Sequence, residues 1–232
     1  MKNSKAQVDV ISAILIVLIA LGLTATAYTW GLPLIQKRQD TAVVERIASH
    51  FDQNNANSLP SRIEFVANNG GEQAFTLDAN GVWLLNPCPA QELPSCSPKQ
   101  NATEFNSIEF TFFSKVTDVS DKDAEGKPIG FISKTPGASC PPSAGILGKD
   151  KSSAVCVKSK QSQDGYEITY KIWFRELDET AGTRGFKIDL TKHEGSSYTS
   201  VGKTIRISRQ STNQVPAAGK TLIIPEIKIL LE

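Results

Sequence analysis

The fold is decided by the stretch VISAILIVLIALGLTATAYTWGLPLI, residues 10–35, which holds no charged side chain and follows the basic tip MKNSK, residues 1–5. As an α-helix rising about 1.5 Å per residue, it reaches about 39 Å, more than the roughly 30 Å hydrocarbon core of a bilayer. Apolar side chains such as Ile11, Leu15 and Leu18 lie on every side, so no polar face is left for water. The stretch therefore predicts a helix that is buried all round, either in lipid or in a bundle of identical helices.

Two ordinary export elements compete with this interpretation. A secretory signal peptide has an apolar region of about 7 to 15 residues followed by small residues at a cleavage site. Here the apolar run is longer, and Tyr28, Trp30 and Pro33 stand where small residues are needed. A plain signal anchor, which leaves a surface domain tethered by one helix, fits the hydropathy and stays open.

The residues just ahead of the apolar run favour a third element. Lys5-Ala6-Gln7-Val8 places a charge, a small residue and a polar residue directly before it, and Ser12 lies at the start of the Ile/Leu/Val run. This arrangement resembles the class III signal peptide of archaeal type IV pilins and archaellins, over residues 1–35 only. The bacterial type IV pilin pattern has an aromatic first residue and a glutamate five residues into the mature chain, whereas Gln7 and Ile11 stand at those positions here.

The resemblance implies how the chain is processed and used. A membrane-embedded prepilin peptidase would cut between Ala6 and Gln7, so that the apolar helix stays with the mature protein. The implied product is a cell-surface, extracellular filament, a homopolymer of identical subunits that wait in membrane lipid before assembly. An assembly ATPase and a platform protein are the implied partners, and no cofactor is implied. Asp9 is a hypothetical partner for the amine that cleavage would free at Gln7.

Length and charge bound the rest of the molecule. The chain has 232 residues, of which 40% are hydrophobic, enough for one long helix and one head domain of ordinary size. Lys and Arg number 25 against 24 Asp and Glu, which leaves no electrostatic footprint for nucleic acid. The predicted organisation is a leader peptide at 1–6, a hydrophobic helix at 7–57 and a head domain at 61–232.

The helix is expected to continue beyond the apolar run. Apolar residues between Val44 and Phe51 recur at helical spacing. Pro33 removes a backbone donor, which predicts a kink or a short unwound stretch at residues 31–35. The Asn- and Ser-rich residues 54–58, with the proline after them, are expected to end the helix.

From residue 61 onward, apolar and polar residues alternate between turn signals, which is typical of an antiparallel sandwich. Residues 61–67 are predicted as the first strand. Two hairpins are predicted, residues 74–85 around Asp-Ala-Asn-Gly and residues 154–174 around Gln-Asp-Gly. Pro225 interrupts the last apolar run and predicts an edge strand or a bulge. The predicted fold class is α+β, a long kinked N-terminal hydrophobic helix followed by an antiparallel β-sandwich head domain.

Four cysteines, all in the predicted head, indicate disulfide bonds, because an even count in an exported chain favours them. Closeness in sequence suggests Cys88 with Cys96 and Cys140 with Cys156, although four cysteines allow three connectivities. A closed loop of roughly 15 residues adds about 3 kcal/mol of stability. A zinc site is the weaker alternative, since no CxxC spacing occurs.

Two surface motifs accompany the cysteines. Asn101-Ala102-Thr103 is an acceptor tripeptide for N-glycosylation, so the mature chain is a candidate glycoprotein. Asp121, Asp123 and Glu125 resemble the opening of a calcium loop, but its twelfth position is Ile132 rather than a carboxylate. A solvated acidic turn is the favoured interpretation there.

Motifs of catalysis are missing, and the sequence predicts no enzyme. The chain has no H-E-x-x-H, no G-x-S-x-G, no P-loop and no G-x-G-x-x-G, and His50 and His193 are its only histidines. The best-supported prediction is therefore a filament subunit. The alternative is a membrane-tethered or minor-pilin β-sandwich module for binding or adhesion.

Overall fold

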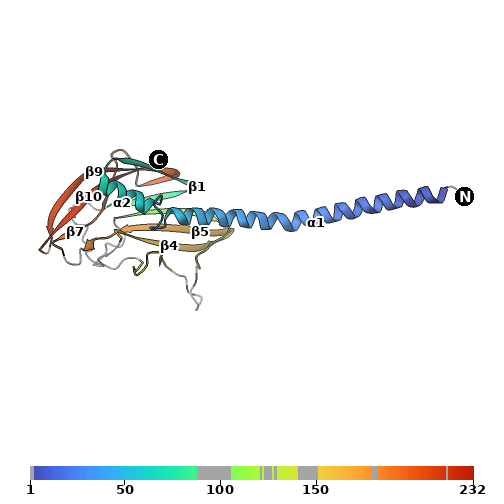
Figure 1. The fold of residues 1–232 in the computed structure, drawn as a ribbon, viewed down its shortest axis with the longest axis horizontal. Coiled ribbons are helices and arrows are strands. Elements are labelled where there is room, and N and C mark those ends of the chain that lie inside the picture. The colour runs from blue at the N-terminus through green and yellow to red at the C-terminus, as the bar shows by residue number, and fades with distance from the viewer. Residues whose placement is uncertain are drawn as a thin grey trace. The chain divides into compact units, whose positions relative to one another are not determined.

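The computed structural model describes residues 3–87, 106–120, 122, 127, 130–140, 151–178, 182–217 and 219–232, with side-chain burial from residue 12 onward. The chain forms two units, residues 1–42 and residues 43–232. The first unit holds most of helix α1 (Asn3–His50). The second, here called the head, holds the end of α1, helix α2 (Leu59–Asn69) and the strands (Figure 1).

Helix α1 is continuous from Asn3 to His50 and contains Pro33. The unwound stretch that was one expectation for residues 31–35 is absent, because all of these residues are helical. A proline removes one hydrogen bond, and a helix of this length keeps the remaining ladder on both sides. The end predicted at residue 57 is also wrong. The side chains of Asp52 and Asn55 accept bonds from backbone N–H groups two residues later, and such turns end the helix earlier.

Helix α2 occupies residues that the alternating pattern assigned to the first strand of the head. Ser58 caps its N-terminus, with its hydroxyl oxygen 3.4 Å from the N–H of Ser61, and Pro60 lies in the first turn. Gly70, at φ 78°, ends it. Leu59, Ile63 and Val66 lie on one face of α2 and are fully buried. The strand prediction for residues 61–67 was therefore wrong.

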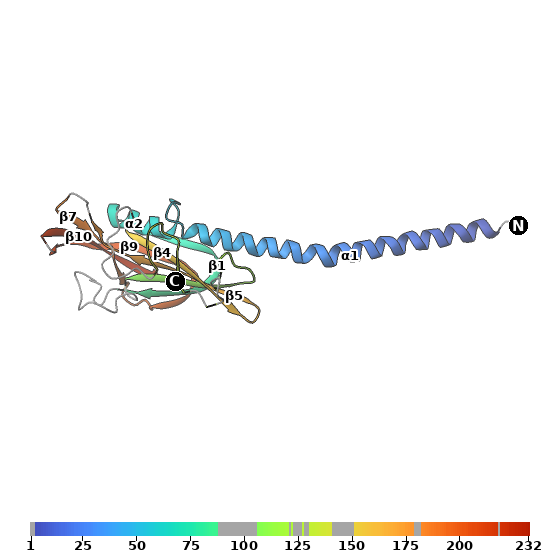
Figure 2. The same cartoon turned by 90° about the horizontal axis from the view of Figure 1, so that it is seen from below.

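The described strands form one curled sheet in the order β3-β4-β5-β2-β1-β9-β10-β7-β6, with β8 also paired to β10 (Figures 1 and 2). Their bounds are β1 (Glu72–Asn86), β2 (Ser107–Ser114), β3 (Ile132–Ser133), β4 (Ser153–Ser162), β5 (Gly165–Phe174), β6 (Leu177–Asp178), β7 (Arg184–Phe186), β8 (Asp189–Lys192), β9 (Thr199–Ala217) and β10 (Lys220–Leu231). Because β7 and β8 pair with β10 in parallel, the sheet is mixed rather than the antiparallel sandwich that was predicted.

One predicted hairpin is present and the other is not. Strands β4 and β5 form the longer hairpin, in which Ser162 pairs with Gly165 across a two-residue turn. The Asp-Ala-Asn-Gly stretch instead lies inside the single strand β1, whose two halves both pair with β9. The register shifts between Thr76 and Gly81, so these residues bulge out rather than reverse the chain. A Cβ atom on Gly81 would clash with the ring of Phe110.

Pro225 lies beside a bulge in β10, one of the two environments predicted for it. The neighbour of β10 changes there, from β7 at residues 221–223 to β8 at residues 226–229. The missing N–H of the proline therefore falls where no ladder bond is required.

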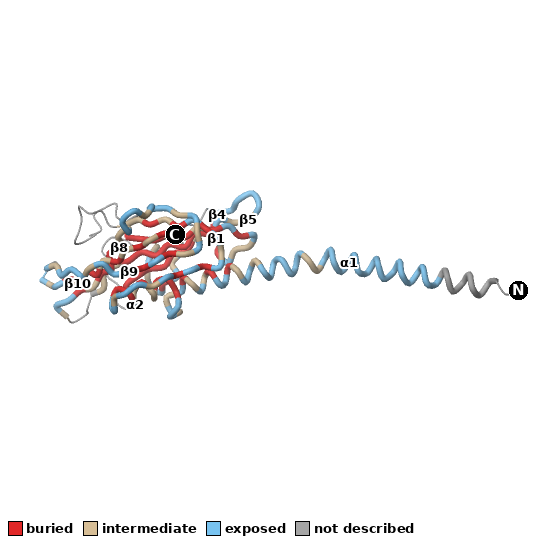
Figure 3. Tube along the Cα trace, turned by 90° about the horizontal axis from the view of Figure 1, so that it is seen from above, coloured by how far each residue is buried: buried red, intermediate tan, exposed pale blue. Residues whose placement is uncertain are grey.

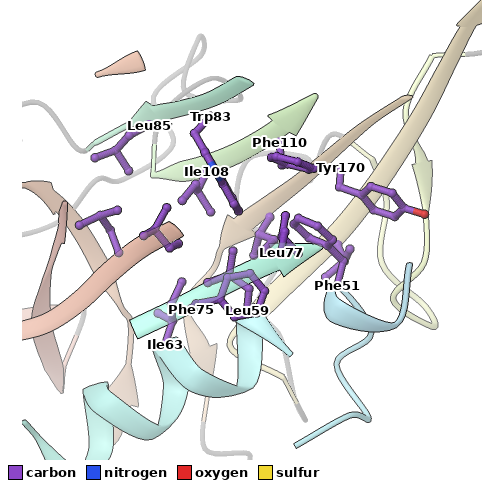
Figure 4. Packing of buried hydrophobic residues seen from close by; sticks show 14 of the residues in the cluster. Phe51, Leu59, Ile63, Phe75, Leu77, Trp83, Leu85, Ile108, Phe110 and Tyr170 are labelled. Atoms are coloured by element: carbon purple, nitrogen blue, oxygen red, sulfur yellow. The ribbon is translucent and has the colours of Figure 1, made fainter. Parts of the chain in front are cut away.

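The core of the head contains an aromatic cluster and is lined by the sheet, by α2 and by the end of α1 (Figures 3 and 4). Phe51 is 1% exposed and stacks on Tyr170, with ring centroids 4.7 Å apart. Trp83 is fully buried against Phe110, at 4.6 Å. Val44 and Ile47 of α1 belong to the same cluster. The head therefore has a hydrophobic core of its own, as a domain of this size requires.

Candidate functional site

The most prominent candidate site is the apolar surface of α1. By length and composition, the part of α1 from Ser12 to His50 can cross a membrane, and its most apolar stretch is not buried within the described chain. Figure 3 shows exposed residues along most of the described part of α1. The large apolar side chains of this segment, each more than half exposed, are Ile14, Leu15, Ile16, Val17, Leu18, Ile19, Leu21, Leu23, Tyr28, Trp30, Leu34 and Ile35.

The three threonine hydroxyls within this surface are satisfied by the helix itself. The hydroxyls of Thr24 and Thr26 donate to the carbonyl oxygens four residues earlier, each at 2.8 Å. The hydroxyl of Thr29 donates to the carbonyl oxygen of Thr26 at 3.0 Å. An unbonded hydroxyl costs several kcal/mol in hydrocarbon, about 4 to 8 on the harshest scale. With these three bonds, α1 suits an apolar environment along this stretch.

The predicted cleavage site lies near the start of α1. Ala6, Gln7 and Asp9 belong to the helical backbone, and their side chains lie outside the described residues. Processing between Ala6 and Gln7 stays a prediction.

The structure joins Cys140 and Cys156 by a disulfide, with their Cα atoms 6.0 Å apart. Cys156 lies on β4, is fully buried, and pairs across the ladder with Ser133 of β3. The bond therefore holds residues 130–140 against the edge of the sheet, where β3 is only two residues long. Several predicted site residues lie outside the described ranges, namely Cys88, Cys96, Asn101, Asp121, Asp123 and Glu125.

Buried charges in the head were missed by the sequence analysis. Lys171 on β5 is 2.5 Å from a carboxylate oxygen of Glu109 and lies over the ring of Trp173, 4.4 Å from its centroid. Lys187 lies 3.2 Å from Asp189, which is fully buried. Burial raises the pKa of Asp189, while the charge of Lys187 opposes that shift. An alternating pattern assigns such residues to solvent, so the sequence carried no signal for these pairs.

A cavity of about 470 Å³ lies between the end of α1 and the β3–β4 edge. Phe51, Val155 and Tyr170 form its apolar wall, and Asp52 and Lys134 are among its polar residues. The hydroxyl of Tyr170 points away from the labelled core residues in Figure 4, is buried, and has no hydrogen-bond partner among the described residues. Burial, and secondarily the charge of Asp118, raises the pKa of this hydroxyl.

The histidines are not part of a catalytic arrangement among the described residues. His50 packs edge-on against Phe75, with centroids 5.5 Å apart, and Nδ1 of His193 lies 2.9 Å from the carbonyl oxygen of Glu194. In the parts of the chain that the structure describes, no three His, Cys, Asp or Glu side chains are grouped to hold a metal ion. The apolar surface of α1 is therefore the site to which a function is best attached.

Comparison of the chain with protein-family models, with curated proteins and with solved structures gives no match.

Proposed function

We propose that the chain is the structural subunit of a type IV pilus-like filament, which is processed between Ala6 and Gln7 and polymerises through α1. The observation that supports this proposal is the exposure of α1 on all sides along Ile14 to Ile35. An ordinary surface helix keeps one polar face, and this helix keeps none.

The size of the apolar surface makes a partner environment necessary. Ten exposed Ile, Leu and Val side chains lie between Ile14 and Ile35. At about 1.5 to 3 kcal/mol each, their burial is worth about 15 to 30 kcal/mol. A subunit will not leave lipid for water against that free energy. A helical array of identical α1 segments provides equivalent burial, through head-to-tail contacts that do not close into a ring.

The remaining parts of the proposal follow from the resemblance of residues 1–35 to archaeal pilins. The precursor is held in the membrane, a prepilin peptidase removes residues 1–6, and an assembly ATPase with a platform protein drives polymerisation. The head then faces the outside of the cell, where an oxidising environment preserves the disulfide of Cys140 and Cys156.

The test combines N-terminal sequencing with electron microscopy of material sheared from cells that produce the full chain. We expect filaments whose subunit begins at Gln7. Leu18→Lys places a charge on the apolar surface and should abolish them. Val201→Lys makes a like change on the head, at a residue that is 78% exposed, and should leave filaments unchanged.

The alternative function, a membrane-tethered binding module, uses the same helix as a simple anchor. It predicts a chain that stays in membranes at low copy number, is found as single molecules in detergent extracts, and gives no long homopolymers in sheared material. That result would overturn the filament proposal.

A further inference from the structure

The C-terminal part of β9, from Ser211 to Ala217, is an open edge of the sheet among the described residues. Strand β1 pairs with β9 only as far as Ser208, and the N–H of Arg209 donates to the carbonyl oxygen of Gly71 just beyond it. From Ser211 onward, β10 is the one strand paired with β9 among the described residues. Thus the side of β9 that faces away from β10 has no neighbouring strand in this part of the described chain.

The backbone polar groups on that side can be assigned from the ladder. The N–H of Lys187 donates to the carbonyl oxygen of Ile223, so Ile223 turns its backbone groups away from β9. Its partner Gln214 therefore turns its own N–H and C=O to the open side, and Thr212, two residues earlier, does the same. Pro225, opposite Thr212, has no N–H to offer in any case.

The open edge carries no charge. Residues 210–219, with the sequence QSTNQVPAAG, lie between Arg209 and Lys220. Thr212, Asn213 and Gln214 are all exposed. Proteins usually protect an open edge with lysine or another charged residue. The part of β4 after Val157, which has no β3 partner among the described residues, carries Lys158 and Lys160. The β9 edge lacks this protection and is available for strand pairing.

The sequence of the edge is nearly palindromic around Thr212. In an antiparallel pairing of two copies, Thr212 lies opposite Thr212, Gln210 opposite Gln214, and Ser211 opposite Asn213. No like charges meet, and threonine and amide pairs of this kind stabilise neighbouring strands. Glu226 already accepts hydrogen bonds from Ser211 and Asn213, at 2.6 and 2.7 Å, so its carboxylate is satisfied within its own subunit.

We infer that residues 210–214 of β9 form a homotypic docking edge, at which two copies of this chain pair antiparallel about a two-fold axis through Thr212. A contact of so few residues is weak between isolated chains. Repeated along two filaments it becomes strong, because each contact brings the next pair of edges together. The bundling of filaments rests on the proposed function, whereas the pairing itself does not.

Cysteine cross-linking of the detergent-extracted full chain tests the pairing and requires no filament. Antiparallel partners in a hydrogen-bonded pair have Cα atoms about 5.5 Å apart, within the range of a disulfide. We expect Thr212→Cys to give at least ten times more covalent dimer under mild oxidation than Gln161→Cys, a matched change at an exposed residue near the open end of β4. Equal yields from the two variants would overturn the inference.

Two further variants test the register and cover the case in which Thr212→Cys disturbs the fold. Gln210→Cys and Gln214→Cys chains should cross-link when mixed and not when oxidised separately.

In the filament, Thr212→Lys and Thr212→Glu should each separate bundles into single filaments, and mixed bundles should form when the two are combined. Thr212→Lys filaments that bundle like the wild type would contradict the inference, and an absence of all filaments would contradict the proposed function instead.

Discussion

Replacement of Phe51 by alanine should destabilise the head more than any comparable change at its surface. The ring is 1% exposed, stacks on Tyr170 at 4.7 Å and lies 6.2 Å from Phe110. Truncating a buried phenylalanine costs about 3 to 5 kcal/mol, from lost transfer free energy and from the cavity that remains. The aromatic contacts place Phe51→Ala in the upper half of that range. For a unit of this size, the melting temperature should fall by about 10 °C or more.

Urea unfolding of the detergent-solubilised chain, followed by tryptophan fluorescence, measures this change, since Trp83 lies 6.5 Å from Phe51. The control is Phe65→Ala, the same truncation on α2 at a residue that is 53% exposed, which should change stability by less than about 0.5 kcal/mol. A loss below about 1 kcal/mol for Phe51→Ala, or equal losses for both variants, would show that the aromatic cluster does not support the head as described.

Three further changes test other parts of the head. Ser58→Ala removes the N-cap of α2 and should lower the free energy of unfolding by about 1 kcal/mol, measured by thermal unfolding. No change would show that the cap does not stabilise α2. Cys140→Ala should cost about 3 kcal/mol under oxidising conditions, and the difference from the wild type should disappear when the wild type is reduced. Tyr170→Phe removes a buried hydroxyl that has no partner in the described parts of the chain, and should raise stability by about 1 kcal/mol. Because burial raises the pKa of Tyr170 above its ordinary value of 10.0, the wild type should also lose stability as the pH rises through 10, and the variant should lose less.

Patterns of neighbouring residues in the sequence predicted two parts of the fold, helix α1 and the β4–β5 hairpin. The uninterrupted apolar run predicted α1, and the short Gln-Asp-Gly turn between alternating residues predicted the β4–β5 hairpin. Helix α2 was missed because Ile63, Phe65 and Ala67 fit a period of two, while Ser58 and Pro60 were assigned to the end of one helix rather than the start of the next. Serine and proline can mark either the end of one helix or the start of the next, and only the burial of Leu59, Ile63 and Val66 distinguishes the two interpretations.

Non-local pairing accounts for the larger differences. The Asp-Ala-Asn-Gly turn signal in β1 does not produce a turn, because Phe75 before it and Trp83 after it both pair with the same strand, β9. The parallel addition of β7 and β8 to β10 depends on contacts that no local pattern encodes. Of the candidate site, the apolar helix could be predicted from composition, whereas the open half of β9 could not, because its exposure depends on where β1 stops.

The internal bonding of Thr24, Thr26 and Thr29 has a consequence for how α1 exchanges surroundings. Since those hydroxyls need no hydrogen-bond partner from outside, they add no penalty to the free energy of the helix either in lipid or in an apolar protein contact. Under the proposed function, withdrawal of a subunit from the bilayer strips none of these three hydroxyls of its hydrogen-bond partner. Exchange of α1 between bilayer and filament would then break no hydrogen bond of these threonines, so other contributions decide its direction.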